Sequence, residues 1–253
     1  MRKIFIPLCL TLIVSCFGGK SAFDDIVNFE KVKVERKSVD FSSDSTYDVS
    51  IMYHSPVNAP AYLKDSILKH TKLLFASWFD VKGQFDLNES VKKHFDEYLR
   101  QIARNSLPAH NAFVLKILPE EVYQNKYIIS FAYSWMIYEG GAHPNSGKYC
   151  FVLDKNTGSK VSYKSLVKEH ESEFLNLAET EFKLQSGIGK DEKIQDPYRF
   201  KGDKFHLTDN YMFTPAGIVF CYNPYEIAPY SFGIIELTLS SEKIKDLIKF
   251  RNY

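Results

Sequence analysis

The stretch "KYIISFAYSWMIYEGG", Lys126–Gly141, decides the fold because its side chains follow a period of two. Successive side chains of a strand point to opposite faces of a sheet, so alternate positions share one face. The residues on the apolar face are Tyr127, Ile129, Phe131, Tyr133, Trp135 and Ile137. Such β-branched and aromatic side chains favour strands that pack against a core. We therefore expect a long strand here, paired as a hairpin with "NAFVLKILP", residues 111–119.

The segments before this hairpin show both periodicities. Residues 45–56 alternate cleanly and predict a strand, with residues 26–35 as its partner. Apolar residues then recur at helical spacing, which predicts two helices. The first is expected at residues 62–79, and the second opens at a cap provided by Asp86 or Asn88.

The segments after the hairpin come in blocks of strands and helices. Strand pairs are expected to turn at Lys155–Gly158 and at Thr214–Gly217, where glycine and proline suit tight turns. A helix is expected at residues 168–184, followed by a polar loop at 186–204. A last strand is expected at 232–240 and a closing helix at 241–250. Blocks of this kind, without strict alternation, predict an α+β fold with a mainly antiparallel sheet and helices packed on it.

The amino-terminal sequence "MRKIFIPLCLTLIVSC", residues 1–16, predicts an export signal. Basic residues precede an apolar run that falls short of the about 20 residues needed to span a bilayer. The ending "IVSC" resembles a bacterial lipobox, in which cleavage precedes the cysteine and the cysteine is acylated. The alternative is a plain signal peptide with an incidental cysteine. We expect a signal peptide at 1–15, lipid attachment at Cys16 and a tether at 16–24.

This anchor predicts a protein of the bacterial cell envelope that faces the periplasm or the cell exterior and meets the membrane through lipid alone. Loss of the signal peptide removes two basic side chains, which lowers the 32 Lys and Arg residues to 30, against 31 Asp and Glu residues. Because the positive and negative charges nearly cancel, the protein has no long-range attraction to nucleic acid. The sequence holds no P-loop, dinucleotide fingerprint, CxxC or HExxH spacing, so we expect neither a cofactor nor a metal site.

Two cysteines belong to the body of the protein, Cys150 and Cys221, and both lie in apolar strand-like stretches. A disulfide between them is permitted in an oxidising compartment. The alternative is a pair of buried thiols in neighbouring strands, because free cysteine packs as a small apolar residue.

The loop "EGGAHPNSG", Glu139–Gly147, leaves the long strand through two glycines. His143 at a strand end is a candidate general base or metal ligand. No nucleophile stands in a recognisable motif beside it, so a catalytic role has little support. We prefer an interpretation in which His143 and Asn145 order the loop or contact a ligand.

A second unusual stretch is "YNPYEIAPYSFG", Tyr222–Gly233. Each of its prolines restricts the residue before it and fixes its own φ, so two close bends are expected. Glu226 is then expected to accept hydrogen bonds from backbone groups exposed in the bend. The alternative is a binding site in which Tyr225, Glu226 and Tyr230 face a partner.

Together these stretches resemble an extracytoplasmic domain of unknown function, found at the carboxyl end of the anti-sigma-V factor (RsiV-like) and in certain peptidoglycan deacetylases. The shared features are the Gly140–Asn145 turn, the Asp154–Gly158 turn and the Tyr222–Tyr230 run. The resemblance implies two associated modules: a companion α+β module at 25–125, and the RsiV-like α+β domain at 126–253.

The resemblance also implies a function. The extracytoplasmic part of the anti-sigma-V factor is a receptor for lysozyme. We expect neither signalling nor deacetylation here, because the sequence shows no sigma-binding segment and no counterpart of the deacetylase metal ligands. What the resemblance implies is a non-catalytic binding module for a protein or glycan partner, such as lysozyme or a peptidoglycan fragment. The alternatives are an envelope hydrolase that uses His143 and Glu226, and a structural envelope protein without a ligand.

Overall fold

The computed structural model describes residues 26–38, 46–80, 86–104 and 112–249. The predicted signal peptide, the lipid site Cys16 and the tether therefore lie outside the described residues. Within the described ranges, no helix combines the length and the apolar character needed to cross a bilayer.

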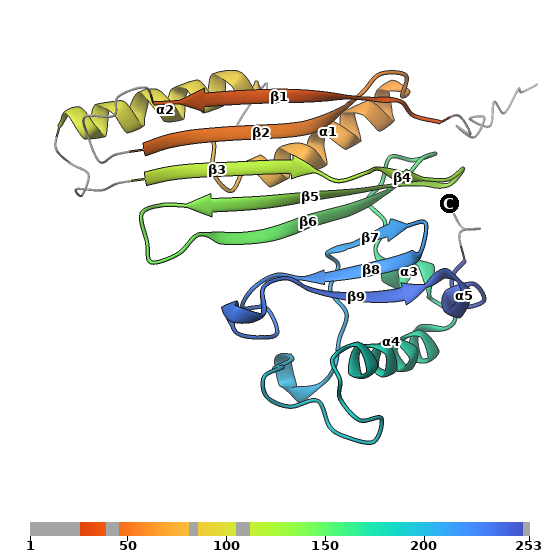
Figure 1. Cartoon of the computed structure of the whole chain (residues 1–253). Helices are drawn as coiled ribbons and strands as arrows, with labels where there is room; N and C mark the ends of the chain where they lie inside the picture. Colours follow the sequence, from red (N-terminus) through yellow and green to blue (C-terminus); the bar gives the residue numbers. More distant parts are fainter. Residues whose placement is uncertain (1–25, 39–45, 81–85, 105–111, 250–253) are drawn as a thin grey trace, which may run out of the picture.

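Six strands of the described chain form the first sheet, drawn in the upper half of Figure 1. They are β1 (Phe29–Lys37), β2 (Thr46–Pro56), β3 (Ala112–Pro119), β4 (Tyr123–Gln124), β5 (Ile128–Tyr138) and β6 (Asn145–Asp154). The order is β1-β2-β3-β5-β4, and β6 also pairs with β5. The predicted strand pairs β1–β2 and β3–β5 are confirmed, and both pairs are antiparallel. β2 and β3 run parallel, because two helices make the crossover between them.

These two helices, α1 (Ala61–Phe75) and α2 (Leu87–Ala103), cover one face of the first sheet. Asp86 caps α2 as predicted, since its carboxylate accepts the Glu89 N–H at 3.2 Å. The apolar stripes of both helices are buried against alternate residues of β2, β3 and β5. This is the first core, and it contains Leu63, Ile67, Val91, Ile51, Leu115 and Phe131.

Three antiparallel strands form the second sheet, below the first in Figure 1: β7 (Tyr211–Thr214), β8 (Gly217–Tyr222) and β9 (Ile235–Ser240). β7 and β8 make the predicted hairpin. Helix α4 (Glu171–Gln185) packs on this sheet through a buried stripe of Phe174, Ala178 and Phe182. The short helices α3 (Tyr163–Leu166) and α5 (Ser241–Ile244) add to the same second core.

The end of α4 also covers the outer edge of β9. The Gln185 side-chain amide donates to the Thr238 carbonyl at 2.8 Å and accepts the Thr238 N–H at 3.1 Å. One glutamine thus satisfies the backbone groups that a further strand would pair with.

Ile128–Tyr133 of β5 and Cys150–Asp154 of β6 are buried on both faces, so the two sheets stack there. Phe131 and Phe151 face the first core, whereas Ile128 and Val152 belong to the second core. Small side chains, including Ala132 and Cys150, line the contact between the sheets. The result is four layers in the order helices, sheet, sheet, helices, which confirms the predicted α+β class with mainly antiparallel strands.

Several predicted elements are shorter than expected: the helix predicted at 62–79 ends at Phe75, and the strand predicted at 232–240 begins at Ile235. The strand pair around the Lys155–Gly158 turn has only one full strand, because the returning chain makes a single bridge between Lys160 and Leu153 before it enters α3. The predicted closing helix at 241–250 ends at Ile244, with no side-chain cap on Ser240. The chain bends there because Leu247 must turn back into the second core.

The first sheet takes strands from both sides of the predicted module boundary at residue 125. β3 pairs with β5 over six residue pairs, from Val114↔Tyr138 to Pro119↔Tyr133. The long strand β5 therefore joins the two predicted modules through one continuous sheet.

Candidate functional site

The two unusual loops of the sequence meet in space. The β5–β6 loop carries His143, and the β8–β9 connection carries Tyr230. Their rings stack with centroids 4.1 Å apart and an interplanar angle of 25°. The Tyr230 hydroxyl also donates a hydrogen bond to the Pro144 carbonyl. Stacking and hydrogen bond together place residues from distant parts of the sequence in one surface.

Two asparagine side chains hold β6 against the second sheet. Asn223 accepts the Lys148 N–H at 2.7 Å and donates to the Lys148 carbonyl at 3.1 Å. Asn210 accepts the Cys150 N–H at 2.7 Å, and it donates to the carbonyls of Lys148 at 3.0 Å and Cys221 at 2.9 Å. These amides satisfy backbone groups at the free edge of β6. They therefore fix the β8–β9 connection beside the β5–β6 loop.

Gly147 makes room for this arrangement. A Cβ atom at Gly147 would lie 2.7 Å from Asn223 Oδ1 and 2.5 Å from the Trp135 ring. Any larger residue would push the asparagine amide away from the strand edge. Gly147, the third residue of β6, is therefore needed for the close approach of Asn223 to the strand.

Tyr225 extends the stack toward solvent. Its ring stacks on Tyr230 with centroids 5.6 Å apart and an interplanar angle of 30°. We call His143, Tyr230 and Tyr225 the ring stack. The Tyr225 backbone has φ of 71°, a left-handed conformation that costs a non-glycine residue about 1–2 kcal/mol. The side chain is nevertheless 64% exposed, so burial of the ring does not offset this strain.

Glu226 lies next to the stack in the same bend. Its backbone N–H donates to the Asn223 carbonyl at 3.0 Å, and its carboxylate accepts a 3.4 Å bond from the Asn223 amide. Desolvation raises the pKa of Glu226 above its usual value, and the bonds from Asn223 oppose this rise. The Glu226 carboxylate thus interacts with the backbone of Asn223, as the sequence predicted, and also with the Asn223 side-chain amide.

The other candidate residues bind close neighbours. His143 Nδ1 lies 3.0 Å from the Pro144 carbonyl, a distance at which a protonated Nδ1 donates. Asn145 is exposed, and its side chain accepts the N–H of Ser146 at 3.0 Å. The structure thus brings His143, Tyr225 and Tyr230 together, with Glu226 beside them, while Asn145 caps its own loop.

A charge network behind these loops escaped the sequence analysis. The Lys148 ammonium lies 2.6 Å from a Glu120 carboxylate oxygen and 2.7 Å from one of Glu236. Partial burial alone would lower the pKa of Lys148, but the bonds to both carboxylates raise it above its usual value. The three residues come from distant segments, so sequence spacing carried no signal for this network.

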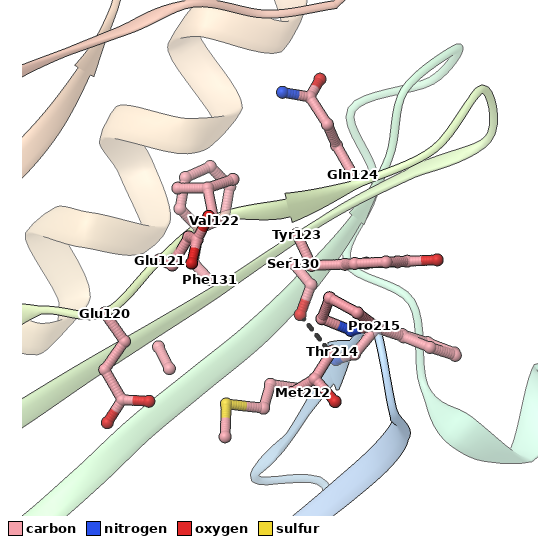
Figure 2. A pocket seen from close by; sticks show the side chains of 12 residues that line it. Glu120, Glu121, Val122, Tyr123, Gln124, Ser130, Phe131, Met212, Thr214 and Pro215 are labelled. Atoms are coloured by element: carbon pink, nitrogen blue, oxygen red, sulfur yellow. Dashed lines mark hydrogen bonds between the residues drawn. The ribbon is translucent and has the colours of Figure 1, made fainter. Parts of the chain in front are cut away.

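Figure 2 shows a hollow of about 350 Å³ between the β4–β5 hairpin and the β7–β8 turn. Its wall includes Glu120, Tyr123 and Met212. The dashed bond in the figure runs from the Phe213 N–H to Ser130 Oγ, at 2.7 Å. This bond is buried and joins the two sheets at the floor of the hollow.

A second hollow, of about 500 Å³, adjoins the ring stack. The polar loop provides Asp196, Pro197 and Arg199, and the β8–β9 connection provides Tyr225–Pro229. The two segments are joined by the Arg199 N–H, which donates to the Ile227 carbonyl at 2.7 Å. Ile227 is 3% exposed and anchors this wall in the second core.

The two cysteines face each other between the sheets. Cys150 and Cys221 are both buried free thiols, with their sulfur atoms 3.8 Å apart. The hydrogen bond to the Cys221 sulfur raises the pKa of Cys150, and burial raises it further. In the described ranges, no group of three or more His, Cys, Asp or Glu side chains is placed to hold a metal ion.

Comparison with known proteins identifies one domain. A family described as "Protein of unknown function (DUF3298)" matches residues 164–242, a range that includes α4 and the whole second sheet. The chain therefore carries a DUF3298 domain. No curated protein matches the chain.

Two solved structures resemble the whole fold. A member of the DUF3298 family from Bacteroides fragilis NCTC 9343 is 17% identical with a TM-score of 0.68, and the match covers 91% of this chain and 99% of that chain. A DUF3298 family protein from Pseudomonas aeruginosa PAO1 is 19% identical with a TM-score of 0.60, covering 89% and 96%. At these identities the likeness shows the fold alone.

Proposed function

We propose that this chain, with its DUF3298 domain, is a cell-envelope lipoprotein whose ring stack binds a protein or glycan partner. The proposed partner is lysozyme or a peptidoglycan fragment, and the proposed anchor is the acylated Cys16. The binding role is non-catalytic. We further propose that residues 126–253 form an RsiV-like domain and residues 25–125 its companion module.

One observation carries the binding proposal: Tyr225 is a large, exposed aromatic side chain on a strained backbone. Strain of this kind persists where the surrounding structure enforces it, and it is concentrated at functional sites. Here Tyr230 stacks on Tyr225, and the 3.2 Å bond from the Tyr225 N–H to the Ala228 carbonyl closes the turn. Rigid aromatic rings provide contact area for sugar faces and for protein anchors at a small loss of conformational entropy.

The contacts of His143 and Glu226 favour binding over hydrolysis. His143 approaches the Pro144 carbonyl, and Glu226 accepts a bond from Asn223. The two side chains therefore interact with separate neighbours and not with each other. A base and acid pair that acts on one substrate needs both groups within reach of the same reacting atoms. The hydrolase alternative stays a prediction from the sequence.

Pull-down of the full chain with lysozyme and, separately, with soluble muropeptides tests the proposal. We expect retention of one of these partners, and we expect Tyr225→Ala to weaken it by about tenfold or more, as at other aromatic anchors. Leu184→Ala is the matched control, because Leu184 is 68% exposed and lies on α4. Failure to bind either partner, or equal loss in both variants, would overturn the proposal.

A further inference from the structure

The hollow of about 500 Å³ beside the ring stack carries a more specific inference about ligand chemistry. We propose that it binds a diamino monocarboxylic acid, a lysine-like ligand with free α-ammonium, α-carboxylate and side-chain ammonium groups. This rests on the proposed function, because Tyr225 and Glu226 belong to both the hollow and the surface around the ring stack.

The charges of the wall set the ligand class. The hollow has one guanidinium, Arg199, and two carboxylates, Asp196 and Glu226. Two negative charges and one positive charge leave a single net negative charge. A ligand with one carboxylate and two ammonium groups has the opposite set of charges. Complementary charge on both sides favours this class over neutral sugars and over acidic ligands.

The geometry assigns a place to each group. Arg199 Nε binds an Asp196 carboxylate oxygen at 2.7 Å, which leaves the outer N–H groups of the guanidinium for a ligand carboxylate. The α-ammonium shares a carbon with that carboxylate, so it falls beside Asp196. We assign the side-chain ammonium to Glu226, on the part of the lining that the β8–β9 connection provides, where the exposed Tyr225 ring offers a cation–π contact.

The walls of the hollow are fixed before any ligand arrives. The bond from the Arg199 N–H to the Ile227 carbonyl joins the loop to the β8–β9 connection. The neighbouring Tyr198 ring packs edge-on against Phe182 of α4, at 5.1 Å between centroids, and against Phe232, at 5.9 Å. A site held by packed aromatic residues loses little entropy when it binds.

Calorimetric titration of the full chain at neutral pH and low ionic strength tests the inference with three probes. These are L-lysine, L-lysinamide, which lacks the carboxylate, and Nε-acetyl-L-lysine, which lacks the side-chain charge. We expect L-lysine to bind with a Kd of about 1 mM or tighter, and each modified probe to bind about tenfold more weakly. Equal binding of the three probes, or no binding of L-lysine, would overturn the inference.

Variants of the protein test which side chain recognises the ligand carboxylate and which recognises its side-chain ammonium. Arg199→Gln should remove the preference for lysine over lysinamide, and Glu226→Gln the preference for lysine over Nε-acetyl-lysine. Arg100→Gln is the matched control, because Arg100 is also an exposed arginine with an (i,i+3) carboxylate partner, Glu97. A melting curve for each variant verifies folding. A preference that survives in Arg199→Gln and Glu226→Gln contradicts the assignment.

The test is separable from that of the proposed function. If L-lysine fails to bind while lysozyme or muropeptides are still retained through Tyr225, this inference alone falls. If L-lysine binds with the expected preferences and neither larger partner is retained, the proposed function falls and the amino-acid site stands.

Discussion

At the scale of single residues, the side-chain amides of two asparagines link strand β6 to the segments of the second sheet. Asn223 and Asn210 form hydrogen bonds with backbone groups of Lys148 and Cys150. These two side chains thus take the place that a further strand would have at the free edge of β6. An amide is suited to this because it has one acceptor and two donor hydrogens, as a peptide group has an acceptor and a donor. The candidate site depends on these bonds, since they place the β8–β9 connection beside His143.

Replacement of Asn223 with alanine tests this dependence. The Lys148 N–H would lose its bond to Asn223, and the Lys148 carbonyl would keep the bond from Asn210 but lose the one from Asn223, so we expect a loss of about 1–3 kcal/mol in the free energy of unfolding. Urea denaturation measures it. Asn145→Ala is the control, because Asn145 is exposed and its side chain accepts a bond from the adjacent Ser146, and it should change stability by less than about 0.5 kcal/mol. Equal effects of the two variants would show that Asn223 is not a structural link.

A buried histidine in the first core makes stability depend on pH. His54 is 5% exposed between Phe29 and Phe131. Burial, aided by the charge of Lys31, lowers its pKa from 6.5 to about 4. The unfolded chain therefore binds more protons between these two values, so stability is fully present above pH 6.5 and falls as the pH drops toward 4.

The expected loss from His54 across this range is on the order of 3 kcal/mol, and His54→Phe should remove that part of the pH dependence. Urea denaturation at a series of pH values measures it. Burial also lowers the pKa values of His70 and His94, so a smaller slope should persist in the variant. The exposed His143 gives the control variant His143→Asn. An unchanged slope in His54→Phe would contradict the assignment.

Sequence reasoning found the residues of the ring stack for a physical reason. Tyr225 and Tyr230 stand outside any alternating pattern, so the core does not explain them, and His143 follows two glycines. Asn210 and Lys148 were missed, because their importance comes from partners far away in the chain. A polar residue at a strand end carries no signal of the backbone groups that it will bind.

At the scale of elements, β5 explains both the success and the limit of the sequence analysis. The apolar face of β5 was predicted correctly from its period of two, and Ile129, Phe131 and Tyr133 are buried in the first core. The opposite face carries Ile128 together with Ser130, Ala132 and Ser134, a mixture that gives no continuous apolar pattern. The second sheet nevertheless covers it, because small side chains let the sheets approach and Ser130 accepts a backbone bond.

The contact between the sheets makes a prediction about the cysteines. Cys150 and Cys221 are buried free thiols, and the pKa of Cys150 is raised, so the reactive thiolate is disfavoured. We expect both to resist iodoacetamide in the native protein and both to be alkylated after denaturation without reductant. Mass spectrometry of peptides counts the adducts. Alkylation that requires prior reduction would instead establish a Cys150–Cys221 disulfide.

At the scale of the whole molecule, four layers place the candidate site at loops and leave the sheets as support. The class of the fold followed from blocks of strands and helices. The parallel pairing of β2 with β3 did not, because it depends on how α1 and α2 carry the chain across the sheet. Neither did the stacking of the sheets, which joins segments with no local relation in sequence.

The proposed anchor is also a property of the whole molecule. Cys16→Ser removes the thiol that is acylated in a lipoprotein, so the chain should lose incorporated fatty acid and leave the membrane fraction. Metabolic labelling with a fatty acid and fractionation of cells measure both. Cys150→Ser is the control, because Cys150 is buried in the folded body. A labelled Cys16→Ser protein would contradict the anchor.

The amide of Gln185 on the edge of β9 has a consequence for crowded surfaces. An open strand edge is a template on which further chains can polymerise, and lipid anchors raise the local concentration of chains. Gln185 blocks this template at Thr238, and at the far edge of the first sheet β1 displays charges such as Lys31, Lys33 and Glu35. Gln185→Ala should therefore raise light scattering at high protein concentration, whereas unchanged scattering would refute this. The proposed lipid anchor would gather many copies on one membrane, and there the blocked edge would oppose aggregation.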